Sequence, residues 1–254
     1  FANPINKIDF VGLNVISSSS LIDLLPVEIG DQYNEQISNK IIEVLFKTGY
    51  FSDIKIDINS DNLLITLIEN PVVKYFDVKT GSGSAWSDWL NAESDFLNDA
   101  TINEYIESNE LSAGNIYTQS KFSDFVSSLK DEYIAAGFYN VQIDSNIDVD
   151  MQNRIGIELN VNQGKRATIN SMTISGAAKF SEKELLDLFS IGEADMMLIN
   201  FFTNKDRYSD LALNQSLELM NNHYFNSGYL DFKILNVNST LNDSKDKLSI
   251  DIQI

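Results

Sequence analysis

The sequence predicts an α+β protein made of three tandem βααββ modules, each a three-stranded mixed sheet with two helices on one face. Three features recur in the same order about every 90 residues, which suits a small domain better than a helical solenoid. They are an apolar strand that ends in glycine, a glycine-aromatic turn after a helical stretch, and an alternating hairpin. The strand ends are residues 10–12, 78–81 and 173–176, and the turns are residues 49–51, 137–139 and 228–230.

The first module is predicted over residues 1–70. Ile8 and Phe10 share one face of a strand, and a short helix over residues 17–25 is stopped by Pro26. Asn34 can cap a second helix that ends at Gly49. The apolar stripe of this helix is Ile37, Ile41, Val44 and Leu45. Residues 54–58 and 63–67 then alternate between apolar and polar side chains, which predicts a hairpin with one buried face.

The second module is predicted over residues 71–164. It begins with a strand over residues 73–80 and continues, after an acidic insertion, into a helix that ends near Gly114. Thr101 and Glu104 fit a capping box at the start of that helix. The next helix stops at Gly137, and apolar alternation at residues 141–143 and 155–161 predicts the hairpin.

The third module is predicted over residues 165–254. Its first strand covers residues 167–175, and Ser181 and Glu184 fit a second capping box. The last helix ends near Gly228, and the closing hairpin joins residues 232–239 to residues 248–254. The joints at residues 69–71 and 163–165 are short, so we expect the chain to bend there rather than to hang loosely.

Composition excludes several classes of function. A net charge of −19 argues against binding to nucleic acid or to an anionic lipid surface, which both need clustered lysine and arginine. The chain has no cysteine, so disulfides and thiolate metal sites are excluded. It has no apolar run long enough for a membrane helix and no signal-peptide pattern at residues 1–4, which suits a cytoplasmic chain or a mature or excised fragment.

The polar residues give no sign of an active site. His223 is the only histidine, so we expect it to pack or to lie on the surface rather than to bind zinc or act in a nucleophile relay. Pairs such as Asp148 with Asp150, and Asp243 with Asp246, fall in predicted loops and on solvent faces, where carboxylates stay hydrated. The prediction is therefore of a protein with no catalytic residue, no metal and no cofactor.

An insertion in the third module carries four large apolar side chains. They either tuck under a helix or form a patch that docks a protein partner, because methionine and aromatic clusters suit adaptable recognition. The residues of this possible docking patch are Met196, Met197, Phe201 and Phe202.

Three stretches carry a family resemblance, at residues 41–51, 174–180 and 221–229. Together with the βααββ order, they make the chain resemble the POTRA (polypeptide-transport-associated) domains of the Omp85 family. The resemblance implies the first three of five modules, in the periplasm of a Gram-negative bacterium, with a membrane barrel beyond this chain. It also implies a scaffold that guides unfolded outer-membrane protein precursors and docks accessory lipoproteins and a periplasmic chaperone.

The resemblance places the exposed sheet edge on the first strand of each hairpin. An uncovered edge presents unpaired backbone N–H and C=O groups that can template a partner strand. In the third module Lys233 is the only charge in this strand, so its protection looks weak. The expected protein-binding edge strand contains Phe232, Lys233, Ile234, Leu235, Asn236, Val237 and Asn238.

Two other interpretations stay open at this stage. One is the arm of a related transporter of the TamA or two-partner secretion type. The other is a hydrolase or sugar-binding protein that uses the acidic loops.

Overall fold

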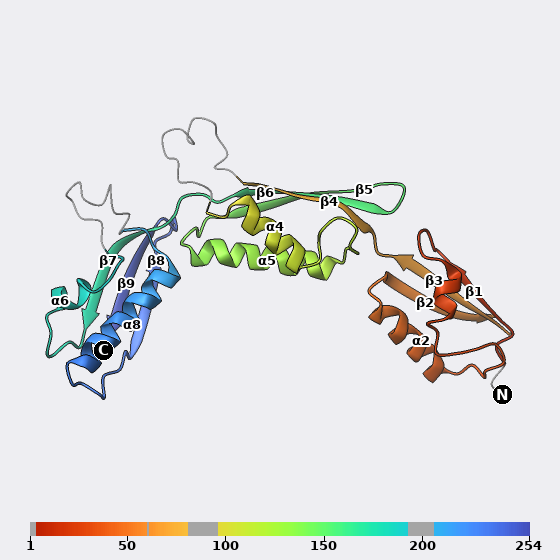
Figure 1. The fold of residues 1–254 in the computed structure, drawn as a ribbon, viewed down its shortest axis with the longest axis horizontal. Helices are drawn as coiled ribbons and strands as arrows, with labels where there is room; N and C mark the ends of the chain where they lie inside the picture. The colour runs from red at the N-terminus through yellow and green to blue at the C-terminus, as the bar shows by residue number, and fades with distance from the viewer. Residues whose placement is uncertain (1–3, 60, 81–95, 193–205) are drawn as a thin grey trace. The chain divides into compact units, whose positions relative to one another are not determined.

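The computed structural model describes residues 4–59, 61–80, 96–192 and 206–254 (Figure 1). Contacts divide the chain into two compact units. The first unit contains Phe1–Val78, Asp99–Phe125 and Ser145–Leu159, and the second contains Lys79–Asn98, Val126–Asp144 and Asn160–Ile254. The chain forms three three-stranded sheets, and the boundary between the two units passes through the second of them.

The first sheet has the strand order β1-β3-β2, with β1 at Lys7–Val11, β2 at Phe51–Asn59 and β3 at Asn62–Glu69. β1 runs parallel to β3 and β2 runs antiparallel to it. The helices of this module are α1 (Ser18–Ile22) and α2 (Glu35–Lys47). Ile41 and Leu45 of α2 are fully buried in one cluster with Leu63 and Ile65 of β3, so β3 carries the centre of the core.

Local capping defines both helices of the first module. The Asn34 side chain accepts the Ile37 N–H at 2.9 Å, which confirms the predicted cap of α2. Ser17 caps α1, and this helix ends at Ile22, four residues before Pro26.

The middle sheet has the order β4-β6-β5, with β4 at Val72–Thr80, β5 at Gln142–Val149 and β6 at Arg154–Asn162. Its helices are α4 (Asp99–Ser108) and α5 (Gln119–Ala135). The predicted capping box is wrong, because α4 begins at Asp99 and Thr101 lies inside it. The helix also ends well before Gly114. The side chain of Asn109 caps the carbonyl of Tyr105 at 2.8 Å, and Glu110 adopts a left-handed φ of 55°.

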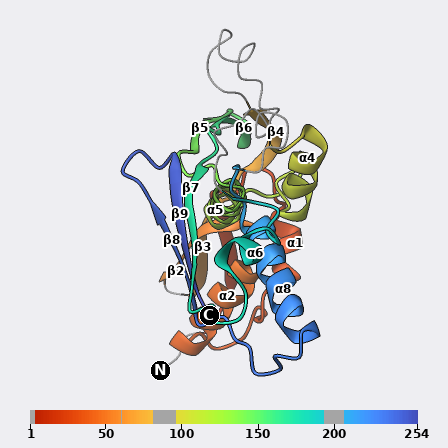
Figure 2. The ribbon, with the colours of Figure 1, turned by 90° about the vertical axis from the view of Figure 1, so that its left-hand side faces the viewer.

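The third sheet has the order β7-β9-β8, with β7 at Thr168–Ser175, β8 at Asn236–Leu241 and β9 at Lys247–Gln253. Again the first strand is parallel, and the second antiparallel, to the last. The helices α6 (Glu182–Leu186) and α8 (Asp210–Asn226) lie on the same side of this sheet (Figure 2). Leu185, Met220 and Tyr224 from these helices share a buried cluster with Ile250 and Ile252 of β9.

The glycine-aromatic turns hold the joints between repeats. In the first unit, Asn70 donates its backbone N–H to the Tyr50 carbonyl at 2.7 Å and its side-chain N–H to the Gly49 carbonyl at 2.8 Å. In the second unit, Ala167 donates its N–H to the Gly137 carbonyl at 2.8 Å. In the first two modules the turn that ends the second helix therefore also fastens the chain that leaves the module.

One glycine at the end of β1 is required by close backbone approach. Gly12 has a φ of 92°, and an added Cβ would lie 3.2 Å from the carbonyl carbon of Leu67 and closer still to its oxygen. Gly30 has a similar φ of 105° with open space around it. We expect Gly12→Ala to cost about 2–5 kcal/mol of unfolding free energy, from left-handed strain plus overpacking, and Gly30→Ala about 1–2 kcal/mol.

Urea unfolding of the two variants measures this difference. Equal losses would mean that backbone conformation alone, and not contact with Leu67, requires glycine at position 12.

Candidate protein-docking edge

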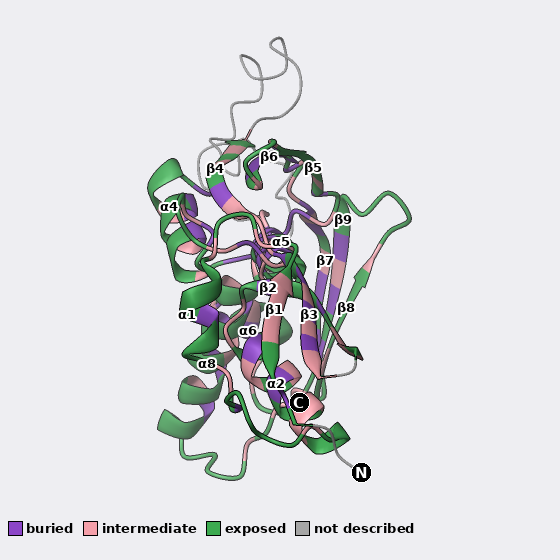
Figure 3. Ribbon diagram, turned by 90° about the vertical axis from the view of Figure 1, so that its right-hand side faces the viewer, coloured by how far each residue is buried: buried purple, intermediate pink, exposed green. Residues whose placement is uncertain are grey.

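β8 forms one edge of the third sheet and is largely exposed beside the buried β9 (Figure 3). The Asn242 N–H donates to the Lys247 carbonyl at 3.0 Å, so these two residues form a hydrogen-bonded pair of the antiparallel ladder. Such pairs alternate along the ladder. The even-numbered residues of β8 therefore turn their backbone groups to β9, and Val237, Ser239 and Leu241 turn theirs away from the sheet.

The structure moves the predicted edge strand toward the C-terminus. β8 begins at Asn236, so Phe232, Lys233, Ile234 and Leu235 precede it. The Phe232 ring stacks on Tyr224 with centroids 3.8 Å apart and planes 8° apart, and this packing draws the chain toward α8. Of the predicted residues, Asn236, Val237 and Asn238 lie in the strand, and Ser239, Thr240 and Leu241 extend it.

β8 differs from the corresponding edges in its charge. β2 carries Asp53, Lys55 and Asp57, with an ion pair of 2.9 Å between the last two, and β5 carries Asp144 and Asp148. Charged side chains on an edge discourage pairing with another strand. The six residues of β8 include no charged side chain, so this edge has no such protection.

The opposite edge of the same sheet, β7, is also uncharged, but its backbone groups are engaged at both ends. At one end the Ile169 N–H donates to the Asp206 carbonyl at 2.8 Å, and Thr168 forms a bridge with Arg207. At the other end the Ile174 N–H donates to the Glu182 carboxylate at 2.9 Å. β8 is therefore the more accessible template of the two edges.

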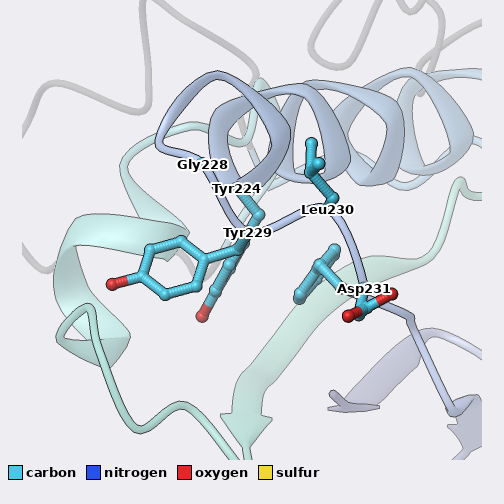
Figure 4. Close-up of a pocket in the computed structure, with 6 residues that line it drawn as sticks. Tyr224, Gly228, Tyr229, Leu230 and Asp231 are labelled. Atoms are coloured by element: carbon cyan, nitrogen blue, oxygen red, sulfur yellow. The ribbon is translucent and has the colours of Figure 1, made fainter.

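A small open pocket lies where the chain enters β8 (Figure 4). Its volume is about 300 Å³, and its lining residues come from the end of α8 and the turn that follows. Leu230, which lines the pocket, and Leu235, the residue before β8, are exposed to 71% and 65%. The lining residues are Tyr224, Gly228, Tyr229, Leu230, Asp231 and Phe232.

The sequence interpretation did not assign this pocket, although Gly228 and Tyr229 belong to the recurring turn on which it relied. An exposed leucine after a glycine-aromatic pair is the signal that could have found it. The predicted docking patch of Met196, Met197, Phe201 and Phe202 lies outside the described residues.

His223, Asp150 and Asp246, the polar residues considered above, contact neighbouring side chains of their own module. His223 lies in α8 with its ring 4.6 Å from that of Phe180 and its Nε2 4.0 Å from Glu184 Oε1. A hydrogen bond from Arg154 lowers the pKa of Asp150, and hydrogen bonds from Ser244 and Asn242 lower that of Asp246. A general acid near neutral pH needs the opposite, a raised carboxyl pKa.

The described residues contain no group of three or more histidine, cysteine or acidic side chains placed to hold a metal ion. Among the described helices, none has the length and apolarity needed to span a membrane.

The similarity to known proteins extends over all three repeats. The family model POTRA, "Surface antigen variable number repeat", matches residues 4–70, 93–164 and 167–254. The chain is 28% identical over 250 residues to the outer membrane protein assembly factor BamA of Neisseria meningitidis serogroup B, a match that covers 98% of this chain and 30% of that protein. It is 25% identical to BamA of Buchnera aphidicola, covering 98% of this chain and 38% of that one.

A solved structure is similar along the whole chain. POTRA1-3 of the periplasmic domain of Omp85 from Anabaena is 12% identical with a TM-score of 0.44, and the match covers 100% of this chain and 96% of that one. The chain spans only about a third of the length of the two BamA relatives.

The backbone directions in β8 predict a difference between two neighbouring proline variants. Ser239 turns its N–H outward, so Ser239→Pro keeps the ladder with β9. Asn238→Pro removes a ladder bond and leaves a carbonyl of β9 without its donor, which should cost about 2 kcal/mol more. Urea unfolding of the third module checks this, and equal costs would contradict the assigned directions.

Proposed function

The chain belongs to the POTRA family, and on that premise we propose that it is the periplasmic arm of an Omp85-type outer-membrane assembly factor such as BamA. Its modules occupy residues 1–70, 71–164 and 165–254, and they act as a non-enzymatic scaffold. Two relatives that match 98% of the chain are named as outer membrane protein assembly factors, and this similarity supports the proposal.

The proposed mechanism is β-augmentation at β8. The outward backbone groups of Val237, Ser239 and Leu241 offer donors and acceptors to an extended client strand. Backbone pairing tolerates many sequences, and this property suits a scaffold that meets many unfolded β-rich clients. The uncharged, accessible edge of β8 is the single observation that carries the proposal.

The pocket at the start of β8 supplies side-chain preference. In strand addition, backbone bonds give affinity and pockets for alternate side chains give specificity. Tyr224, Tyr229 and Phe232 line the pocket with aromatic surface, so it suits an apolar client side chain. The proposed partners are unfolded outer-membrane protein precursors, accessory lipoproteins such as BamB, and a periplasmic chaperone.

A strand peptide with alternating apolar residues tests the mechanism in titrations of the whole chain followed by NMR. Ser239→Pro removes one outward N–H and places a ring at the edge. We expect it to weaken binding at least about tenfold, the equivalent of about 1.4 kcal/mol. Unchanged affinity with a folded third module would contradict pairing at β8.

A matched pair of charge variants separates the two edges of the sheet. Asn238 in β8 and Asn170 in β7 are both exposed asparagines in uncharged edge strands. Asn238→Lys should weaken the same peptide several-fold because it places a charge on the docking edge, and Asn170→Lys should leave binding unchanged. A larger effect from Asn170→Lys would move the docking site to β7.

A further inference from the structure

Module two contacts the third module at the far end of the docking edge. Asn140 follows the glycine-aromatic turn of module two, and its side-chain N–H donates to the Ser244 carbonyl at 2.9 Å. Ser244 lies in the turn that joins β8, which ends at Leu241, to β9, which begins at Lys247. Asn140 and Ser244 both belong to the second compact unit. The C-terminal end of β8 is therefore held from the neighbouring module.

The turn between β8 and β9 presents this carbonyl in a fixed direction. The Asp246 carboxylate accepts hydrogen bonds from the Asn242 side chain at 2.7 Å and from Ser244 Oγ at 2.6 Å. The Oδ1 of Asn242 accepts the N–H groups of Asp246 at 3.1 Å and of Lys247 at 3.0 Å. Side chains that bond to nearby backbone groups in this way fix the conformation of a turn. The acceptor of Asn140 therefore belongs to a structured turn.

A second contact from module two lies behind the middle of β8. The Tyr139 ring stacks on Tyr208 with centroids 6.2 Å apart and planes 29° apart. Tyr208 is 4% exposed, and its hydroxyl donates to Asp210 Oδ1 at 2.6 Å and interacts with the side chain of Ser239. Burial and the bond to Asp210 raise the pKa of Tyr208, so the hydroxyl keeps its proton. Tyr208 therefore connects Tyr139 of module two with Ser239 of β8.

The backbones of the two modules also approach closely at this place. The Ala167 N–H donates to the Gly137 carbonyl at 2.8 Å, and the Tyr208 N–H donates to the Ala167 carbonyl at 3.2 Å. A Cβ added at Gly137 would lie 2.6 Å from the Tyr208 carbonyl oxygen. Residues 137–140 therefore contact the third module through both backbone and side chains.

We propose that Tyr139 and Asn140 of module two are positioning residues for the client edge of module three, a proposal that rests on the docking function proposed for β8. Asn140 holds the end of the strand, and Tyr139 supports its middle through Tyr208. An edge strand loses conformational freedom when a client strand pairs with it, and an edge already held in its extended form loses less. The contacts from module two therefore raise client affinity without touching the client.

The first joint supplies a matched control. There Asn153, in the turn between β5 and β6, donates a side-chain N–H to the Glu69 carbonyl at 3.2 Å. This bond also joins an asparagine amide to a backbone carbonyl across two modules, but it lies in the first unit and does not involve β8. An equivalent substitution at Asn153 should therefore leave the client edge unchanged.

Asn140→Asp tests the hold on the strand, because it keeps the size of the side chain, removes the N–H donor and places a carboxylate against the Ser244 carbonyl. The N–H groups of Thr240 and Asn242 face β9, so their exchange reports opening of the end of β8. In the whole chain we expect this exchange, followed by NMR, to be about three- to tenfold faster, the factor that one hydrogen bond contributes. The affinity for the strand peptide should fall by a similar factor, and Asn153→Asp should change neither quantity.

Two variants of Tyr139 test the support behind the strand. Tyr139→Ala removes the ring that stacks on Tyr208 and should weaken peptide binding several-fold, whereas Tyr139→Phe keeps the ring and should retain most of the affinity. Equal losses in the two variants would contradict support through the ring.

Unchanged exchange or unchanged peptide affinity in Asn140→Asp, with a folded third module, would overturn the proposal. A purely structural role would lower the urea midpoint of the third module and leave the affinity of the folded chain as it is. If the wild-type chain does not bind the peptide, the docking function itself fails, whereas exchange in the free chain still reports whether Asn140 holds β8.

Discussion

The central place of the last strand in each module is the constraint on which the rest of the structure depends. In the first and third sheets the last strand pairs in parallel with the first strand and antiparallel with the second. It therefore receives hydrogen bonds on both sides and carries the most buried residues, such as Ile65 and Ile250. The first strand of the hairpin is left at the edge, where a partner can reach it.

Much of this arrangement could be predicted from sequence, because period-two alternation and helix caps are local signals. Asn34 and Ser181 cap helices as expected, and Ser17, predicted as the first residue of its helix, caps that helix instead. The start of β8 could not be predicted in the same way. Phe232 and Ile234 continue the alternation, but the Phe232 ring stacks on Tyr224. The Leu235 N–H also donates to the carbonyl of Gln253, which is already the register partner of Asn236. A distant aromatic contact overrides the local pattern there.

The difference in accessibility between the two edges of the third sheet could not be predicted from the sequence either. β7 and β8 are equally free of charge, and no local pattern separates them. Contacts at both ends engage β7. The carbonyl of Asp206, which lies far along the chain, accepts the Ile169 N–H, and the carboxylate of Glu182 accepts the Ile174 N–H. Tertiary placement, and not composition, makes β8 the accessible edge.

The glycine-aromatic turn links the edge to the joints. In modules one and two its carbonyl groups hold the residues that leave the module, at Asn70 and Ala167. In module three the same turn, at Gly228 and Tyr229, lines the pocket beside β8. A turn that binds the neighbouring segment of its own chain in two modules thus lies, in the third, beside a strand edge suited to a partner chain. One recurring backbone geometry therefore fastens segments of its own chain in two modules and borders an exposed strand edge in the third.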